Sequence, residues 1–386
     1  MISSIKRKTV AYISGTRADF GLMTPILKAI HNHSDLELLS YATGMHLMPA
    51  YGETIHEVEA IFPDTKRIEA VFGIKDPTGT VRFAADYFHK ITDELIQTKP
   101  EIILILGDRI EMLYSALAAF SLGVPIAHVH GGDKTQTVDD AYRHAITKLA
   151  HVHLPATQEA ADRIKKLGEE EWRIHLVGAP ALDAILHEKL PTREELFRDL
   201  GLDLGDKVIL VTQHPVSEDT DGSSSQINET LEAVKSFNLP VVVTYPNADT
   251  GSQAMIDVIE RERQNSKFKI FKNLAYTNFL ALEREATVWV GNSSGAMIES
   301  ASFGTPVVNI GGRQAGRARG ANVIDVHYDR DQIRRAIERS LNDLDYRATL
   351  KNIVNLWGDG QTGGRVANIL ANLEINRRLL EKQITY

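Results

Sequence analysis

The sequence contains no cysteine among its 386 residues. Disulfide bonds, thiolate nucleophiles and cysteine-ligated metals are therefore excluded. No apolar run approaches the roughly 18 residues of a membrane span. The basic segment Met1–Lys8 leads directly into a strand-like segment instead of the apolar core of a signal peptide. We therefore expect a cytoplasmic protein with no membrane partner.

Positive charge is scarce over the chain as a whole. There are 43 Lys and Arg residues against 51 Asp and Glu residues, which gives a formal net charge of -8 at pH 7. Because a nucleic-acid-binding surface needs a basic face, we expect no nucleic-acid partner. A local basic site is still compatible with this charge, since Arg313, Arg317 and Arg319 lie in one glycine-rich segment.

Short apolar runs alternate with longer amphipathic segments along most of the chain. Strands that alternate with helices indicate parallel sheets covered on both faces. The sequence therefore predicts an α/β fold with two doubly wound, Rossmann-like domains. The predicted strands are Thr9–Ser14, Leu36–Ala42, Glu101–Leu106, Pro125–Val129, His151–Pro155, Ile174–Val177, Lys207–Thr212, Pro240–Thr244, Phe268–Phe271, Thr287–Val290 and Pro306–Ile310.

The series of predicted strands is interrupted between Leu182 and Asp206, where a charged helix is expected over Arg193–Leu200. We place the domain boundary there. Residues 1–185 form the predicted N-terminal Rossmann-like domain. Residues 186–365 form the predicted C-terminal Rossmann-like domain, and residues 366–386 form a helix that packs back toward the N-terminal domain.

Polar residues follow many of the predicted strands. In open α/β sheets, ligands bind beyond the carboxyl ends of the strands. We therefore expect one ligand in the cleft between the two domains. The segments concerned are Gly15–Arg17, Gly107–Arg109, His130–Asp133, Gln213–Pro215, Tyr245–Asn247, Gly291–Ser294 and Gly311–Arg313.

The segment Gly291–Glu299 is the most informative of these. It follows the strand-like run Thr287–Val290, and a helix is predicted over Ala296–Phe303. Free backbone N–H groups at the positive end of a helix favour a diphosphate. A serine N-cap would account for one of the two serines, but the sequence has no capping box that would account for Glu299. We therefore predict a phosphate site.

Carboxylates and histidines gather behind the N-terminal strands. Asp108 either caps the next helix or serves as a partly desolvated base. Asp139 precedes Arg143 by one helical turn and can pair with it, and His128 and His130 would share one face of a strand. Five histidines in this region raise the question of a metal site. Their spacing matches no common ligand pattern, so we expect no metal.

Three further positions have both a structural and a functional interpretation. Arg17 can direct its guanidinium at phosphate oxygens, while Asp19 can cap the first helix. His214 and Asn247 each end a strand of the second domain, where they fit turn chemistry or contact with a nucleotide. The chain has neither a G-x-G-x-x-G segment nor a P-loop lysine, so no dinucleotide cofactor is indicated.

Taken in order, these segments resemble the UDP-N-acetylglucosamine 2-epimerase family. The resemblance is greatest to its hydrolysing branch, which makes N-acetylmannosamine for sialic acid-type sugars. It runs from about Thr9 to Leu370 and implies a two-domain, glycosyltransferase-B-like fold. The matching segments are residues 15–19, 107–109, 139–151, 177–180, 214–215, 245–247, 291–294 and 309–317.

The resemblance implies a reaction without a cofactor. Loss of the C2 proton and elimination of UDP would give a glycal-type intermediate, and water would then add at C1 while C2 is reprotonated from the other face. By position, Asp108 and Asp139 resemble the acid/base carboxylates, and His130 would shuttle protons. Which carboxylate removes the C2 proton stays open. The positions that resemble UDP-binding residues are Arg17, His214, Asn247, Phe279, Gly291, Ser293, Ser294, Glu299 and Arg313.

Asp133, which we place with the catalytic residues, departs from the family pattern. Hydrolysing relatives usually have Glu at this position, in His-x-His-Gly-Gly-Glu. The shorter side chain leaves two donors open: UDP-N-acetylglucosamine, and the UDP-linked 2,4-diacetamido-2,4,6-trideoxyhexose of legionaminic acid-type pathways. Three rival interpretations are a non-hydrolysing epimerase, a glycosyltransferase of the same fold and a non-catalytic nucleotide-sugar-binding protein. The family also implies a homodimer or homotetramer.

Overall fold

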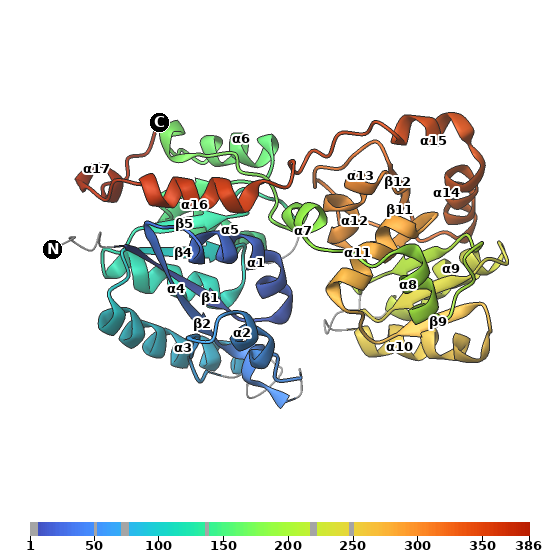
Figure 1. Ribbon diagram of the computed structural model, residues 1–386, viewed down its shortest axis with the longest axis horizontal. Helices are drawn as coiled ribbons and strands as arrows, with labels where there is room; N and C mark the ends of the chain where they lie inside the picture. The colour runs from blue at the N-terminus through green and yellow to red at the C-terminus, as the bar shows by residue number, and fades with distance from the viewer. Residues whose placement is uncertain (1–6, 50–51, 71–76, 136–138, 217–221, 247–250) are drawn as a thin grey trace. The chain divides into compact units, whose positions relative to one another are not determined.

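The computed structural model describes the chain except for residues 1–6, 50–51, 71–76, 136–138, 217–221 and 247–250. The chain divides into two compact units, which can be followed in Figure 1. Unit 1 comprises Met1–Ala184 and Trp357–Tyr386, and unit 2 comprises Ile185–Leu356. The chain re-enters unit 1 at Trp357, ahead of residue 366, where the sequence placed the returning segment. No helix among the described residues is long and apolar enough to cross a membrane.

Unit 1 is built on a six-stranded parallel sheet with the order β3-β2-β1-β4-β5-β6. All five residues of β4 are buried, as expected for a parallel strand that is covered on both faces. The strands are β1 (Lys8–Ser14), β2 (Leu36–Ala42), β3 (Lys66–Arg67), β4 (Ile102–Leu106), β5 (Ile126–Val129) and β6 (Val152–Leu154).

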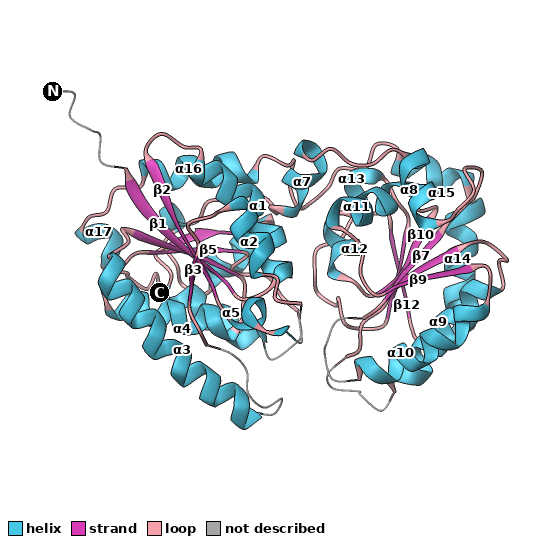
Figure 2. Cartoon of the chain, turned by 60° about the horizontal axis from the view of Figure 1, so that its bottom comes forward, coloured by secondary structure: helices cyan, strands magenta, loops and turns pink. Residues whose placement is uncertain are grey.

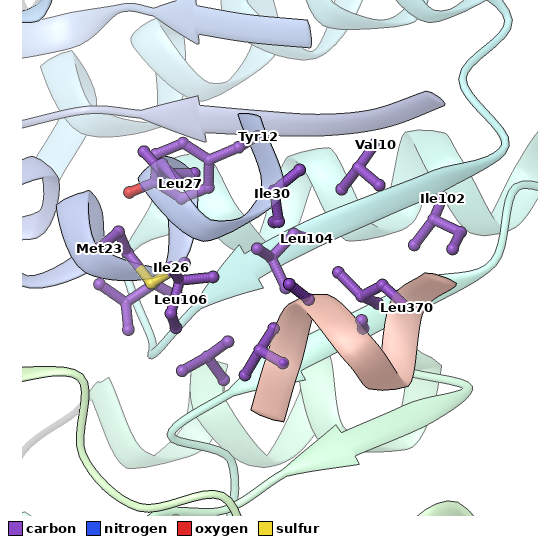
Figure 3. Close-up of a cluster of buried hydrophobic side chains, with 14 of the residues drawn as sticks. Val10, Tyr12, Met23, Ile26, Leu27, Ile30, Ile102, Leu104, Leu106 and Leu370 are labelled. Atoms are coloured by element: carbon purple, nitrogen blue, oxygen red, sulfur yellow. The ribbon is translucent and has the colours of Figure 1, made fainter. Parts of the chain in front are cut away.

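Alternate residues of the strands in unit 1 supply two separate cores. Tyr12 and Leu104 face the cluster that includes α1, shown in Figure 3. Ala11 and Ile103 face the opposite cluster, because successive strand side chains point to opposite faces. The helices are α1 (Arg17–His31), α2 (Ile55–Ile61), α3 (Pro77–Thr98), α4 (Ile110–Ser121), α5 (Asp139–Leu149), α6 (Gln158–Lys166), α16 (Thr362–Asn372) and α17 (Arg377–Leu380), with 3₁₀ turns η1 (Gly44–Leu47) and η3 (Glu171–Arg173).

Helix α16 packs against α1, although the two lie at opposite ends of the sequence. The carboxylate of Asp183 accepts hydrogen bonds of 2.9 and 2.6 Å from the first two backbone N–H groups of α16, which satisfies donors that a helix leaves open. A Cβ at Gly363 would lie 2.8 Å from the Pro25 carbonyl oxygen in α1. Glycine therefore permits the close approach, and Leu370 completes the core beside β4.

Unit 2 has a second six-stranded parallel sheet, with the order β12-β11-β10-β7-β8-β9. The strands are β7 (Ile209–Thr212), β8 (Val241–Thr244), β9 (Phe268–Phe271), β10 (Val288–Gly291), β11 (Val307–Ile310) and β12 (Val323–Val326). The helices are α8 (Arg193–Leu200), α9 (Ser223–Lys235), α10 (Ser252–Arg261), α11 (Tyr276–Glu285), α12 (Ser294–Ile298), α13 (Ser300–Phe303), α14 (Arg330–Asn342) and α15 (Leu344–Leu350), with the 3₁₀ turn η4 (Glu262–Gln264), and α7 (Ala181–His187) spans the boundary between the units.

The two sheets have the same topology. When strands are counted from the first strand of each unit, both sheets run 3-2-1-4-5-6, which is the doubly wound Rossmann-like order. Figure 2 shows each sheet flanked by helices. The predicted fold class, two Rossmann-like domains in a glycosyltransferase-B-like chain, is confirmed. The strand order reverses between β1 and β4 in unit 1 and between β7 and β10 in unit 2, and such switch points are where ligands bind.

Three local predictions need correction. The predicted strand Ile174–Val177 makes only an isolated bridge to β6, from Ile174 to His153, and not the continued ladder of a strand. The edge strands β3 and β12 were not predicted, because β3 has two exposed residues and β12 is only partly buried. The predicted helix Ala296–Phe303 is two short helices, α12 and α13, which meet at Glu299.

Candidate active site

Asp108 lies directly beyond β4, at the switch point of unit 1. It does not cap the next helix, because Arg109 is the N-cap residue of α4 and makes no side-chain capping bond. Instead, the Asp108 carboxylate accepts a hydrogen bond from the guanidinium of Arg143 on α5. The capping explanation for Asp108 is therefore wrong, and its carboxylate is held by a cation on a neighbouring helix.

Arg143 is the centre of this part of the site. It is 4% exposed, and its Nη1 also donates to Asp140 over 2.9 Å. Asp140 in turn accepts from the backbone N–H and the hydroxyl of Thr135, at 3.0 and 2.8 Å. A buried guanidinium that is shared by two carboxylates makes charge-assisted hydrogen bonds to both. Arg143 therefore fixes Asp108 as an anion at the strand end.

Asp139 begins α5 and is exposed. Its charge reaches Arg109 at the start of α4. Burial alone would lower the pKa of Arg109, but Glu111, Asp19 and Asp139 together raise it. Asp108 and Asp139 thus each have a cationic neighbour: Arg143 on α5 for Asp108, and Arg109 at the start of α4 for Asp139.

His130 adopts a backbone conformation that is unusual for a residue with a side chain. Its φ is 57°, in the left-handed region that costs most residues free energy and that often marks functional sites. Its Nδ1 lies 2.9 Å from Oδ2 of Asp133, which is 5% exposed. When Nδ1 donates to this carboxylate, the lone pair lies on Nε2, which suits the ring for proton transfer. The ring centroid is 6.1 Å from that of Trp357.

His128 has a different environment, so the expectation that it shares a strand face with His130 is wrong. His128 lies within β5 and is fully buried, whereas His130 has left the strand. The His128 Nε2 is 2.7 Å from the carbonyl oxygen of Gly107. Burial lowers the pKa of His128 to about 3, so the ring is neutral and donates to that carbonyl. Among the described residues, no group of three His, Cys, Asp or Glu side chains is placed to hold a metal ion.

Arg17 is exposed at the start of α1, and its Nε donates to Glu57 over 2.8 Å. The preceding turn is a complete capping box. The hydroxyl of Thr16 accepts from the N–H of Asp19, and the carboxylate of Asp19 accepts from the N–H of Thr16. Asp19 therefore takes part in the predicted cap as the N3 residue of the box, whereas the N-cap residue is Thr16. Burial raises the pKa of Asp19 to about 6, against the opposing effect of Arg109.

In unit 2, Gly291 closes β10 where only glycine fits. Its φ is 141°, and a Cβ there would lie 1.8 Å from the Thr212 carbonyl oxygen on β7. Ser293 is the N-cap residue of α12, yet its side chain makes no capping bond. Ser294 is the first helical residue, and both serines are partly buried. The Ser293 hydroxyl thus does not serve the helix that it precedes.

Asn292 connects three loops at the switch point of unit 2. Its Oδ1 accepts from the His214 N–H over 2.7 Å, and its Nδ2 donates to the His214 carbonyl over 2.9 Å. Its own carbonyl accepts from Gln314 at 2.9 Å and from Arg313 at 3.2 Å. Asn292 is completely buried. Asn292 therefore fixes the position of two predicted UDP-binding residues: its side-chain amide holds His214, and its backbone carbonyl holds Arg313.

The other predicted nucleotide contacts lie around this loop. Burial, and secondarily the charge of Arg313, lowers the pKa of His214 to about 3, so this histidine is neutral. Phe279 packs edge to face against Trp289, with centroids 5.7 Å apart. Glu299 is 6% exposed, and burial raises its pKa. Asn247 lies outside the described residues.

Sequence reasoning missed three contributors to these two switch points: Arg143 as the partner of Asp108, Asn292 as the connector of loops, and a second buried carboxyl, Glu283, which contacts Glu299. The first two stand inside the segments that the sequence singled out. Glu283 stands in an ordinary amphipathic helix, α11, where no local pattern distinguishes a buried glutamate from an exposed one.

Comparison with known proteins places these features in a family. The family model described as UDP-N-acetylglucosamine 2-epimerase matches residues 28–371. The UDP-N,N'-diacetylbacillosamine 2-epimerase (hydrolyzing) of Legionella pneumophila is 35% identical over 98% of this chain and 100% of its own. The UDP-N-acetylglucosamine 2-epimerase of Neisseria meningitidis is 33% identical over 86% of this chain and 87% of the relative. A crystal structure of a Neisseria meningitidis UDP-GlcNAc 2-epimerase bound to UDP-GlcNAc superposes with a TM-score of 0.80 at 19% identity, covering 94% of this chain and 99% of that one.

Proposed function

Because the chain belongs to the UDP-N-acetylglucosamine 2-epimerase family, we propose that it is a hydrolysing 2-epimerase of a UDP-linked 2-acetamido sugar. It releases UDP and a free sugar that is inverted at C2. The hydrolysing relative from Legionella pneumophila, which matches over nearly the full length of both chains, supports this branch. The predicted homodimer or homotetramer and the cytoplasmic location stay predictions.

The proposed reaction has two stages. A base removes the proton from C2 while the C1–O bond breaks, and both bonding electrons leave with the diphosphate oxygen of UDP. The resulting double bond between C1 and C2 is then hydrated: water supplies a hydroxyl group to C1, and a proton returns to C2 on the opposite face. Both stages need groups that exchange protons within hydrogen-bond reach of C2.

The observation that most supports the proposal is the hydrogen bond that the buried guanidinium of Arg143 donates to Asp108, at the switch point of unit 1. This contact presents an ionised carboxylate beyond a strand end. We propose that Asp108 and Asp139 supply acid/base function and that His130, oriented by Asp133, carries protons through Nε2. Its left-handed backbone supports the last assignment, because strain of this kind is kept where a side chain needs a particular direction.

We propose that unit 2 binds UDP. The backbone N–H groups ahead of α12, the unused hydroxyl of Ser293 and the guanidinium of Arg313 suit a diphosphate. Neutral His214 adds a hydrogen bond without a fixed charge. Ser294, Gly291, Phe279, Glu299, Asn247 and Arg17 are proposed contacts on the strength of the family resemblance.

Two donor sugars follow from the relatives. UDP-N,N'-diacetylbacillosamine is the substrate in the name of the Legionella pneumophila relative. UDP-N-acetylglucosamine is the substrate in the name of the Neisseria meningitidis relative. The longer match and the short side chain of Asp133 favour the diacetamido sugar, which is bulkier at C4, and UDP-N-acetylglucosamine is the second candidate.

The decisive experiment incubates the protein with each donor in D₂O and identifies the products by mass spectrometry. We expect free UDP and a free 2-epimeric sugar that carries one deuterium at C2. A UDP-linked epimer without UDP release would identify a non-hydrolysing epimerase. Failure to turn over either donor would contradict the proposal.

A further inference from the structure

Two carboxyl groups lie in contact inside unit 2, close behind the loop that we propose for the diphosphate. Glu283 on α11 is fully buried, and Glu299 between α12 and α13 is 6% exposed. The two carboxyl groups lie close enough to affect each other's ionisation. No donor group among the described residues reaches either oxygen of Glu283. The pair therefore has no cation or N–H group on the Glu283 side to compensate negative charge.

Two buried carboxyl groups in contact cannot both be ionised near neutral pH, and the pair therefore holds one proton between them. Glu283, which lacks donors, is the member that keeps the proton and donates to Glu299. Burial raises the pKa of Glu283 well above its ordinary value, and the nearby charge of Glu299 adds to this. Burial also raises the pKa of Glu299, while the hydrogen bond from Glu283 lowers it.

Among the residues that the structure describes, the other titratable groups that act on the pair do not supply a positive charge. Tyr276, about two turns from Glu283 on α11, has a buried hydroxyl without a hydrogen-bond partner among the described residues. Its pKa is raised first by burial and then by the charges of Glu299, Glu283 and Glu188. The surroundings of the pair thus contain acids and a phenol, which strengthens the case for a shared proton.

The carboxylate of Glu299 lies over the first turn of α12. A Cβ at Gly295 would stand 2.8 Å from Oε2 of Glu299, so the glycine makes room for this carboxylate. The backbone N–H of Glu299 donates to the Gly295 carbonyl over 2.7 Å. The Glu299 carboxylate is therefore held beside Gly295, the residue after Ser294, while Glu283 is fully buried.

We propose that Glu283 is a positioning residue which, by holding the shared proton, keeps Glu299 as an ionised acceptor for the two neighbouring hydroxyls of the nucleotide ribose. This inference rests on the proposed function, in which Glu299 faces the ribose of UDP. Glu283 itself touches no ligand. Two consequences follow: the pair discriminates UDP from 2'-deoxy-UDP, and this discrimination changes with pH in a way that depends on Glu283.

The test measures the dissociation constants of UDP and 2'-deoxy-UDP by calorimetry from about pH 6 to pH 9. Their ratio cancels the titration of the phosphates and the base, which the ligands share. We expect the parent to prefer UDP by about tenfold or more at neutral pH, the effect of a hydrogen bond to a charged group. The preference for UDP should fall at alkaline pH, where the shared proton leaves the pair and the two carboxylates repel each other.

Three variants separate the roles. Glu283→Gln keeps a donor for Glu299 but cannot ionise, so it should retain the preference and lose the alkaline fall. Glu283→Leu removes the donor and leaves Glu299 as an isolated buried acid, which becomes protonated, so the preference at neutral pH should approach one. Glu285→Gln, on the same helix, removes a carboxylate that pairs with Arg193 and should behave as the parent.

A second measurement needs no ligand. The infrared C=O stretch of a protonated carboxyl group should be present near neutral pH in the parent, and the difference spectrum against Glu283→Gln should show its loss. Because this reads the proton directly, it decides the shared-proton step even where Glu283→Leu fails to fold. If Glu283→Gln retains the preference for UDP and Glu283→Leu loses it, Glu283 acts by positioning Glu299 and not only by filling the core.

The outcomes are separable from those for the proposed function. If the parent binds UDP with the expected preference but hydrolyses neither donor, the proposed reaction is wrong and the role of Glu283 stands. If Glu299→Gln abolishes the preference while Glu283→Leu and Glu283→Gln keep the parent value at every pH, the inference is overturned. If the parent does not bind UDP, both are wrong.

Discussion

At the switch point of unit 1 the strand ends are surrounded by ion pairs, whereas at the equivalent point of unit 2 they are joined by a neutral amide. Arg143 holds Asp108 beyond β4, and Asn292 holds His214 beyond β7. The sheets have the same order, so topology selects where side chains meet and leaves their chemistry open. Unit 1 has the charged groups that proton transfer needs, and unit 2 has the donors that an anion needs.

The largest difference to test concerns two glycines at the end of the fourth strand of each sheet: Gly107 directly follows β4, and Gly291 is the last residue of β10. A Cβ at Gly291 would lie 1.8 Å from the Thr212 carbonyl oxygen, whereas a Cβ at Gly107 would meet nothing within 4 Å. Gly107 has a φ of 67°, so alanine there costs about 1–2 kcal/mol from backbone conformation alone. Gly291→Ala should cost about 4 kcal/mol or more, since β7 and β10 must separate.

Calorimetry of the two variants checks this difference. Gly107→Ala should shift the transition modestly, and Gly291→Ala should unfold unit 2 or prevent its folding. Equal shifts would show that the closure of β10 on Thr212 is not a structural requirement, and the description of the switch point in unit 2 would then be wrong.

The next effect concerns catalysis, and it compares one variant in each unit by kcat and by affinity for UDP. Asp108→Asn keeps the shape of the side chain but removes its charge, so we expect kcat to fall by about 10²–10⁴-fold, the range of a lost acid/base group. UDP affinity should hardly change. The matched change in unit 2, Ser293→Ala, should leave kcat at saturation near that of the parent. Loss of UDP affinity in Asp108→Asn, with kcat preserved, would contradict the division of labour.

Most of the strands were accessible from the sequence because parallel strands buried on both faces form apolar runs with recognisable ends, whereas the exposed edge strands β3 and β12 were not. The strand predicted over Leu36–Ala42 coincides with β2, and four of the predicted polar segments follow the strands that flank the switch points, β1, β4, β7 and β10. The bond between Asp108 and Arg143 was not accessible, because it joins residues on different elements. For the same reason, the sequence identified Glu299 but not its partner Glu283.

Acidification should affect the units differently. Burial lowers the pKa of His46 and of His151 to about 4 and that of His128 to about 3. Below about 6.5 the unfolded chain takes up protons that the folded unit excludes, so unit 1 loses stability as the pH falls. Each histidine should contribute about 1 kcal/mol of this loss between roughly pH 6.5 and 5.5. Asp19, with its pKa raised to about 6, opposes them over the same range.

In unit 2 the opposing effects are better balanced. Burial lowers the pKa of His214 to about 3. Like the histidines of unit 1, His214 therefore makes its unit less stable as the pH falls. Glu283 and Glu299 have raised pKa values, so the folded unit keeps a proton that the unfolded chain releases, and their contribution to stability grows as the pH falls. Hydrogen exchange read separately for the two units should show unit 1 opening first at about pH 5.5, and earlier opening of unit 2 would contradict this.

The smallest effect compares two helix N-caps. Thr16 caps α1 through its hydroxyl, in a capping box with Asp19, whereas Ser293 precedes α12 without a side-chain capping bond. Thr16→Ala should therefore cost about 1 kcal/mol of stability, and Ser293→Ala should cost almost none. Ser293→Ala should instead weaken UDP binding by about 1 kcal/mol, roughly fivefold, the value of one hydrogen bond. Thermal unfolding and UDP titration of both variants decide between these roles. If Ser293→Ala destabilises the protein as much as Thr16→Ala and leaves UDP affinity unchanged, its hydroxyl serves the helix and not the diphosphate.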